Sequence, residues 1–359
     1  MTRRLISLAL ASALAAACAL PARADWFPYQ AESISPPFSA DGKRTAFNYQ
    51  PLAKAAKPWE LCVSFPHMKD AYWLGVDYGV VEESRRQGVK MHLFEAGGYT
   101  NLNRQISQIE DCVARGAQAV IIGAISADGL NSLVKSLAAK KIPVIDVING
   151  INSSDLTAKS LVSFYTMGQS AAEYLVKRHP DGSPKVKVGW FPGPAGAGWV
   201  EAAHQGFMDA IKGHTSIEVL DPQYGDTGKE AQSKLVEDAL QAHPDLAYVA
   251  GTAVTAEASV GLVRSRHLQD KVKLLSFYMT PGVYDGIRKG RILAAPADSM
   301  VIQGRIAVDQ AVRALEGRLD EVDRHVGPKI FVVDNANVQS VKLEDILPPA
   351  NFKPVFEVK

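Results

Sequence analysis

The feature that most constrains the fold is an alternation of short apolar runs with amphipathic segments, which begins near Trp59. The runs are 61–65, 89–94, 119–124, 143–148, 186–191, 217–220, 246–250, 272–277 and 292–295. Between them, apolar residues recur at helical spacing, as at positions 102, 106, 109 and 113. Short apolar strands separated by helices predict βαβ units and parallel sheets. Because the runs form two sets, the sequence predicts an α/β fold of two doubly wound, Rossmann-like lobes.

Length and composition agree with two globular lobes. The chain has 359 residues, of which 47% are hydrophobic and 21% charged, which is typical of ordered proteins and argues against a multi-span membrane protein. Lys and Arg total 39 against 38 for Asp and Glu. This balance gives no support to nucleic-acid binding.

The N-terminus predicts export. Arg3 and Arg4 precede an apolar run that ends at Pro21 and the small-residue frame Ala22-Arg23-Ala24, which is typical of a signal peptide cleaved before Asp25. We therefore expect a periplasmic protein without membrane insertion after cleavage. Two alternatives are an uncleaved membrane anchor and a lipid-carrying Cys18.

Removal of the signal peptide leaves Cys62 and Cys112. Two cysteines in an exported protein favour a disulfide over two buried thiols. In a lobe with strand order 2-1-3, the second helix crosses the first strand and can bring Cys112 beside Cys62. We therefore expect the Cys62–Cys112 bond.

The lobe boundaries follow from where the alternation starts, stops and changes set. Residues before Trp59 and after Val341 lack the alternation, so we expect an arm over the first lobe, or one without order, and an irregular tail. The expected division is signal peptide 1–24, arm 25–57, N-terminal lobe 58–163 plus 299–327, C-terminal lobe 164–298 plus 328–340, and tail 341–359.

Aromatic residues follow several of the predicted strands. In doubly wound domains, ligands bind beyond the carboxyl ends of the strands. The residues found there include Asp70, Tyr72, Trp73, Tyr99, Trp199, Tyr278 and Tyr284. Surface loops more often carry Ser, Asn and Asp, so these positions are candidates for a ligand site.

Motifs for catalysis, metals and nucleotides are absent from the sequence. There is no HExxH, GxSxG or GxxxxGK[ST] pattern and no zinc spacing. The glycine-rich stretch 193–199 follows a strand like a dinucleotide loop, but its prolines and Trp199 would obstruct a pyrophosphate. Asp70, Glu201 and Asp298 remain possible catalytic groups without an evident nucleophile–base pair. A binding protein without metal or cofactor is the stronger interpretation.

The two-lobe alternation, the aromatic pair Tyr72-Trp73, KKIPVI (140–145) and GFMDAI (206–211) resemble the ribose-binding (type I) periplasmic binding proteins, from about Trp59 to Val333. The resemblance implies two lobes joined by three hinge strands, with a small ligand in the cleft. Four ligand-binding positions of the sugar binders correspond to other residue types here. Glu201 stands in place of their Arg, Tyr278 in place of Asp, Tyr165 in place of Asn and Asp298 in place of Gln. Aromatic rings and carboxylates in place of hydroxyl-binding groups favour a methylated, cationic ligand over a sugar.

Three segments carry a narrower resemblance: SFPHMKDAYWLGVDYG (64–79), FEAGGYTNLNRQI (94–106) and GPAGAGWVEA (193–202). They resemble the TorT family, periplasmic binding proteins for trimethylamine N-oxide (TMAO) that work with the sensor histidine kinase TorS and induce TMAO respiration. The resemblance implies TMAO and the periplasmic domain of such a kinase as partners. It implies a ligand box of Asp70, Tyr72, Trp73, Tyr99 and Trp199, with Tyr165, Tyr278 and Tyr284 as further candidates.

Each candidate also has an explanation as packing, since Tyr72 can cover a helix start and Trp73 can lie in the core. Two other functions remain open. One is the substrate-binding component of an ABC importer for a sugar or small quaternary amine, and the other is a periplasmic enzyme that turns its ligand over.

Overall fold

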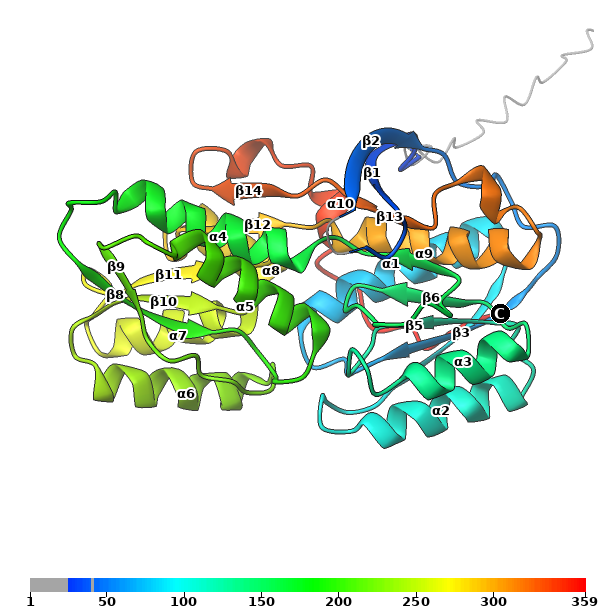
Figure 1. The fold of residues 1–359 in the computed structure, drawn as a ribbon, viewed down its shortest axis with the longest axis horizontal. Coiled ribbons are helices and arrows are strands. Elements are labelled where there is room, and N and C mark those ends of the chain that lie inside the picture. The colour runs from blue at the N-terminus through cyan, green and yellow to red at the C-terminus, as the bar shows by residue number, and fades with distance from the viewer. Residues whose placement is uncertain (1–24, 40–41) are drawn as a thin grey trace, which may run out of the picture.

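The computed structural model describes residues 25–39 and 42–359, and these form two α/β lobes that lie side by side (Figure 1). The predicted fold class is confirmed. The predicted signal peptide, including Cys18, lies outside the described residues. In the described part of the chain, no helix combines the length and apolar character needed to cross a bilayer.

The first lobe is built on a nine-stranded sheet in the order β15-β4-β3-β5-β6-β7-β13-β1-β2. Its strands are β1 (Tyr29–Ser35), β2 (Lys43–Tyr49), β3 (Glu60–Phe65), β4 (Lys90–Glu95), β5 (Ala119–Ile122), β6 (Val144–Val147), β7 (Ala158–Ser160), β13 (His325–Pro328) and β15 (Glu357–Val358). The six central strands of this order, β4-β3-β5-β6-β7-β13, pair in parallel. Strands β1, β2 and β15 add antiparallel edges. The helices α1 (Ala71–Gln87) and α9 (Met300–Leu315) cover one face, and α2 (Leu102–Ala114) and α3 (Asn131–Ala139) cover the other (Figure 1).

The second lobe contains a parallel sheet in the order β11-β10-β8-β9 and an antiparallel pair, β12-β14. Its strands are β8 (Val186–Phe191), β9 (Ile217–Val219), β10 (Leu246–Gly251), β11 (Lys273–Ser276), β12 (Ala294–Ala297) and β14 (Phe331–Asp334). Figure 1 shows α4 (Phe164–Arg178) and α5 (Gly198–Ile211) on one face, with α6 (Lys229–Ala242) and α7 (Ala253–Ser265) on the other. The shorter helices of the second lobe are α8 (Pro281–Arg288) and η2 (Val338–Ser340). Two other short helices, η1 (Leu319–Glu321) and α10 (Leu343–Ile346), lie against α9 of the first lobe.

The chain passes between the lobes at the segments 161–163, 298–299 and 329–330. The second crossing leads directly into α9, which packs on α1 with backbone contact. A Cβ atom on Gly79 would lie 2.1 Å from the carbonyl oxygen of Val301, and one on Gly304 would lie 2.6 Å from that of Val76. This close crossing holds the N-terminus of α1 against the hinge.

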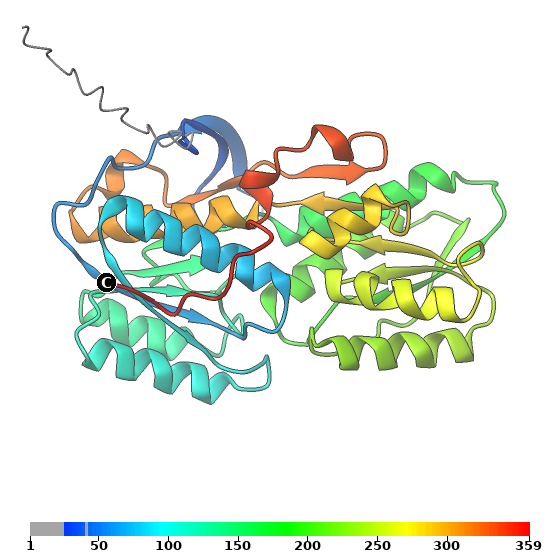
Figure 2. The same ribbon diagram turned by 180° about the vertical axis from the view of Figure 1, so that it is seen from behind.

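Both terminal segments contain strands that the sequence did not predict, and the arm lies against the first lobe. The arm forms the hairpin β1-β2, which extends the sheet beyond β13, and Trp26 stacks on Tyr49 beneath it with ring centroids 6.0 Å apart. The tail passes along α1 and ends as β15 beside β4 (Figure 2). On the way, the backbone N–H of Val355 donates to Asp77 at 2.9 Å. These strands escaped prediction because their partners lie far away in the sequence.

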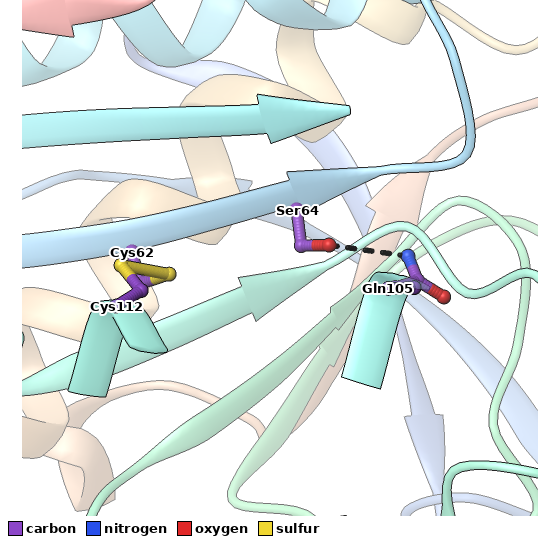
Figure 3. The surroundings of a disulfide bond; sticks show 4 residues. All are labelled: Cys62, Ser64, Gln105 and Cys112. Carbon is purple, nitrogen blue, oxygen red and sulfur yellow. Dashed lines mark hydrogen bonds between the residues drawn. A yellow bond between two sulfur atoms is a disulfide. The ribbon is translucent and has the colours of Figure 1, made fainter. Parts of the chain in front are cut away.

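The predicted disulfide is confirmed. Strands β4-β3-β5 have the expected 2-1-3 order, and α2 crosses β3 so that Cys62 and Cys112 are bonded, with Cα atoms 6.1 Å apart (Figure 3). Gln105 fixes the other end of α2. Its amide donates to Ser64 Oγ at 3.2 Å and accepts from the N–H of Ile125 at 3.0 Å.

Candidate functional site

A small cavity lies between the lobes, where the carboxyl ends of several strands meet. About 20 Å³ of it is open to the centre of a water-sized sphere, little more than one water requires. Both lobes line it, with Asp70, Tyr72, Trp73, Tyr99, Ile148, Asn149, Phe164, Trp199, Thr227 and Tyr278. The structure thus brings together six of the residues that the sequence singled out, from four separate segments of the chain.

The N-terminus of α1 supplies three of these side chains. Asp70 is the N-cap residue, and its carboxylate accepts the N–H groups of Tyr72 and Trp73 at 3.1 and 3.2 Å. An N-cap carboxylate satisfies backbone donors that the helix leaves unpaired. Asp70 therefore fixes the backbone that carries both rings into the cavity.

Trp73 belongs to the core as well as to the cavity. Its ring centroid lies 4.7 Å from that of Phe65, and a Cβ atom on Gly123 would lie 2.3 Å from the indole. Only 2% of the residue is exposed. Trp73 therefore packs in the core and also lines the cavity.

The rings of the cavity wall contact one another edge to face or at a tilt. The ring centroids of Tyr72 and Tyr278 lie 5.2 Å apart at 81°, and those of Trp199 and Tyr278 lie 6.0 Å apart at 88°. Tyr99 and Phe164 flank Trp199 at 6.1 and 5.7 Å. Such contacts are favourable in themselves, so the wall is an ordered set of π faces that spans the two lobes.

Two hydrogen-bond donors in the wall have capacity to spare. The indole Nε1–H of Trp199 is buried and makes no hydrogen bond of good geometry in the part of the chain that the structure describes, although the Tyr99 hydroxyl lies near enough for the indole to lower its pKa. Asn149 donates to the hydroxyl oxygen of Tyr99 at 3.0 Å, which leaves the phenolic proton of Tyr99 for another acceptor. Burial raises the pKa of Tyr99, so the phenol keeps that proton at neutral pH.

Asp70 is the one carboxylate among the described residues that line the cavity, and none of them is Lys, Arg or His. Burial raises the pKa of Asp70 to about 7, against the lowering effect of the N–H groups of Trp73 and Tyr72. A cation in the cavity would favour the ionised carboxylate. The cavity as a whole presents electron-rich faces, one carboxyl group and hydrogen-bond donors that include Trp199 and Tyr99.

The lobes also meet beside the cavity. His67 Nε2 lies 2.9 Å from Thr227 Oγ1, and Lys69 Nζ lies 3.4 Å from an Asp226 carboxylate oxygen. Burial lowers the pKa of His67 to about 4, so this contact joins a neutral imidazole to a hydroxyl at neutral pH. Both contacts hold the first lobe to the loop before α6.

Asp298 lies behind the cavity wall and not in it. The Tyr72 hydroxyl donates to its carboxylate, as does the Gln303 amide at 2.9 Å. Because Asp298 belongs to the second hinge segment, it ties a ring of the cavity to the hinge. Burial raises the pKa of Asp298 to about 6.

Three further candidates, Tyr165, Glu201 and Tyr284, do not line the cavity. Tyr165 follows Phe164 on α4, and adjacent helical residues point about 100° apart, so Tyr165 points away from the cavity that Phe164 lines. Its hydroxyl donates to Asp209 at 3.1 Å. Glu201 is exposed and accepts the N–H of Gly196 at 3.3 Å. Tyr284 lies on α8 and donates to the carbonyl of Val338 at 3.2 Å.

The sequence reasoning missed Ile148, Asn149, Phe164 and Thr227 as wall residues. Ile148 and Asn149 stand at the end of the run 143–148, so the rule that ligands bind beyond strand ends had the signal to find them. Phe164 begins a helix directly after a hinge crossing. Thr227 lies in a loop without periodicity and had no such signal.

No group of three or more His, Cys, Asp or Glu side chains suited to a metal ion occurs among the described residues.

Comparisons with known proteins agree with this architecture. Residues 61–319 match the model of the periplasmic binding protein domain family. The periplasmic protein TorT of Escherichia coli strain K12 is 37% identical over 303 residues, which cover 84% of this chain and 86% of TorT. The chain is a periplasmic binding protein of the TorT family. The resemblance stated from the sequence is confirmed.

Two solved structures extend the comparison. One is an ABC transporter solute-binding protein from Bradyrhizobium sp. BTAi1 with bound bis-tris. It is 70% identical, with a TM-score of 0.79, and the match covers 93% of this chain and 99% of that one. The other is TorT in complex with the TorS sensor domain in the presence of TMAO. It is 33% identical, with a TM-score of 0.75, and the match covers 83% and 99% of the two chains.

Proposed function

We propose that this chain is a periplasmic receptor for TMAO, or a closely related methylated amine, which presents its ligand state to the periplasmic domain of a TorS-like sensor histidine kinase. The observation that carries the proposal is the cavity, whose six rings surround one carboxylate without any basic side chain among the described wall residues. The TorT family supports the same ligand and partner, because its relative is found with TMAO and TorS.

The chemistry of TMAO fits these groups. Its methyl groups carry the positive charge of the nitrogen, and aromatic faces attract such methyls with roughly 0.5–2 kcal/mol per contact. Its oxide accepts hydrogen bonds, and the N–H of Trp199 and the O–H groups of Tyr99 and Tyr278 are donors in the cavity wall. Asp70 belongs on the methyl side, since an ionised carboxylate beside the oxide would repel it.

The ligand is tested by calorimetry with TMAO, choline, glycine betaine and ribose. We expect TMAO to bind in the micromolar range, which corresponds to about −8 kcal/mol, and ribose not to bind. A sugar hydroxyl buried without a partner costs about 1–3 kcal/mol, and this wall offers few partners. Tighter binding of ribose than of TMAO would refute the proposal.

The partner is tested by co-purification with the periplasmic domain of the sensor kinase, with and without TMAO. Ligand shifts the lobe arrangement by no more than its difference in affinity for the two arrangements, so complex formation should depend on TMAO concentration. Turnover is tested in the same samples, because a binding protein returns TMAO unchanged. Absence of any complex at saturating TMAO would count against a sensory role.

A second candidate is the substrate-binding component of an ABC importer for a small amine. The observation that favours it is the 70% identical relative, an ABC transporter solute-binding protein found with bound bis-tris, itself an amine. Both candidates need the same cavity but different partners. Amine uptake that is lost when the gene is deleted, with kinase signalling intact, would favour the importer.

A further inference from the structure

A second cavity lies on the hinge side of the aromatic cavity. About 210 Å³ of it is open to the centres of water-sized spheres, against about 20 Å³ for the first. The two share Ile148, Asn149, Phe164 and Trp199 as a common wall. Strands β2, β7 and β13 of the first lobe and helices α4 and α5 of the second contribute to it, so its shape depends on how the lobes are arranged.

Apart from tyrosines, the ionisable side chains that line this second cavity are basic, whereas the one that lines the first is a carboxyl group. The described residues that line the second cavity include Arg44, Lys159 and His325 and no Asp or Glu. Arg44 is paired with Glu32 at 3.5 Å through one guanidinium nitrogen, and a guanidinium has five N–H donors. Lys159 donates to the carbonyl of Ile151 at 2.8 Å and lies 3.4 Å from Asp146.

His325 adds a donor without an acceptor. The backbone N–H of Phe38 donates to its Nδ1 at 3.2 Å, so the neutral ring carries its proton on Nε2. Burial, with Lys159 and Arg44 nearby, lowers the pKa of His325 to about 3, so the ring is neutral at physiological pH. His325 is 6% exposed, and its Nε2–H finds no acceptor among the described residues.

The N-terminus of α5 faces the same cavity through Gly198 and Trp199. Its N-cap residue, Ala197, has no side chain that can accept a hydrogen bond. The N–H groups of Val200 and Glu201 donate to the carbonyl of Ala197, and Glu201 places a carboxylate in the first turn. The N–H groups of Gly198 and Trp199 come before these and have no acceptor within the helix, and such groups attract negative charge. Basic side chains from the first lobe and backbone donors from the second therefore converge on one space.

We infer that the second cavity is a binding site for a small anion, a carboxylate or a phosphate, which bridges the lobes through Arg44 and His325 on one side and the α5 N-terminus on the other. The bound anion stabilises the lobe arrangement that forms the shared wall. It therefore strengthens amine binding, and by linkage the amine strengthens anion binding by the same factor. This coupling rests on the proposed amine function, whereas the anion site does not.

The site is tested by titrating the full mature chain with succinate and with inorganic phosphate at constant ionic strength, chloride being the reference salt. Calorimetry and the fluorescence of the shared-wall Trp199 report binding, and ¹⁵N spectra of the histidines report the Nε2–H signal of His325. We expect saturable binding of at least one anion and a shift of that signal. Succinate alone identifies a carboxylate site, phosphate alone a phosphate site, and no saturable binding of either overturns the inference.

Arg44→Gln and Lys43→Gln form a matched pair. Both remove one positive charge from β2, but Lys43 is exposed and points to the opposite side of the strand. We expect Arg44→Gln to weaken anion binding at least fivefold and Lys43→Gln to leave it unchanged, with TMAO affinity in chloride the same in both. Equal effects of the two variants on anion binding would overturn the site. A normal anion titration with no TMAO binding would instead reject the proposed function alone.

Discussion

The buried indole of Trp199 leads to the sharpest prediction. Its Nε1–H lies in the cavity wall and makes no hydrogen bond of good geometry among the described residues, and the residue is 5% exposed. Trp199→Phe removes this donor and keeps an aromatic face. We expect the variant to lose affinity for ligands that carry an oxide and to keep most of its affinity for ligands that carry only methyl groups.

The expected size follows from the two interactions. A hydrogen bond to a charged acceptor contributes about 1.5–3 kcal/mol, so TMAO affinity should fall roughly 10- to 150-fold. Tetramethylammonium offers no acceptor and should lose only part of one ring contact, about 0.5–1 kcal/mol. The ratio of the two affinities should therefore change by about tenfold.

The free protein should tolerate this substitution. The smaller ring gives up the packing of a few heavy atoms, about 2 kcal/mol, but an unsatisfied buried N–H, which costs about 1–3 kcal/mol, is removed as well. These two terms nearly cancel. We therefore expect little change in melting temperature, which separates loss of a donor from loss of the fold.

The assay is calorimetry with both ligands on the wild type, Trp199→Phe and a control, Trp190→Phe. Trp190 lies in the core of the same lobe, stacks on Phe207 at 3.9 Å and donates to His204 at 3.1 Å. The control should lower the melting temperature and leave the affinity ratio unchanged. An unchanged ratio in Trp199→Phe would refute the assignment of Trp199 as the oxide donor.

The remaining predictions concern charge, the hinge and the disulfide. Since the pKa of Asp70 is raised to about 7, its ionisation destabilises the folded state progressively as pH rises from about 4 to about 7. Asp70→Asn, which keeps the cap, should raise the melting temperature more at pH 8 than at pH 5. Because ionised Asp70 attracts the methyl groups of TMAO, we expect the wild type to gain TMAO affinity between pH 6 and 8 and Asp70→Asn to lose this gain. Tyr72→Phe removes a donor from buried Asp298 and should cost about 1–3 kcal/mol in urea unfolding; an unchanged midpoint would contradict the hinge contact. Reduction of the Cys62–Cys112 bond, or Cys62→Ser with Cys112→Ser, should cost about 2–5 kcal/mol, and thiol labelling of the unfolded, unreduced protein should find no free cysteine.

The candidate site was predictable where it depends on strand ends. Tyr72, Trp73, Tyr99, Trp199 and Tyr278 follow apolar runs, and parallel strands bring their carboxyl ends to one edge. That rule places a residue at the right edge of the sheet but does not fix the direction of its side chain. A difference of one position along a helix rotates a side chain by about 100°.

Asp298 shows a second limit of such reasoning. The alignment placed it at a ligand position, and it does lie at the expected hinge. Its carboxylate, however, accepts from Tyr72 and Gln303 behind the wall. Whether a buried polar group contacts a ligand or supports a neighbour depends on which donors surround it, and those donors come from other elements.

The sequence by itself determined the two α/β lobes, the parallel core strands and the disulfide, because local periodicity reports which face of an element is buried and fixed connection rules order the strands. Only the tertiary structure decided that β1-β2 and β15 extend the first sheet, that Phe164 and not Tyr165 enters the aromatic cavity, and that Arg44, Lys159 and His325 line one space. These features join residues that are distant along the chain. Their positions depend on how the lobes close on each other, which leaves no periodic trace in the sequence.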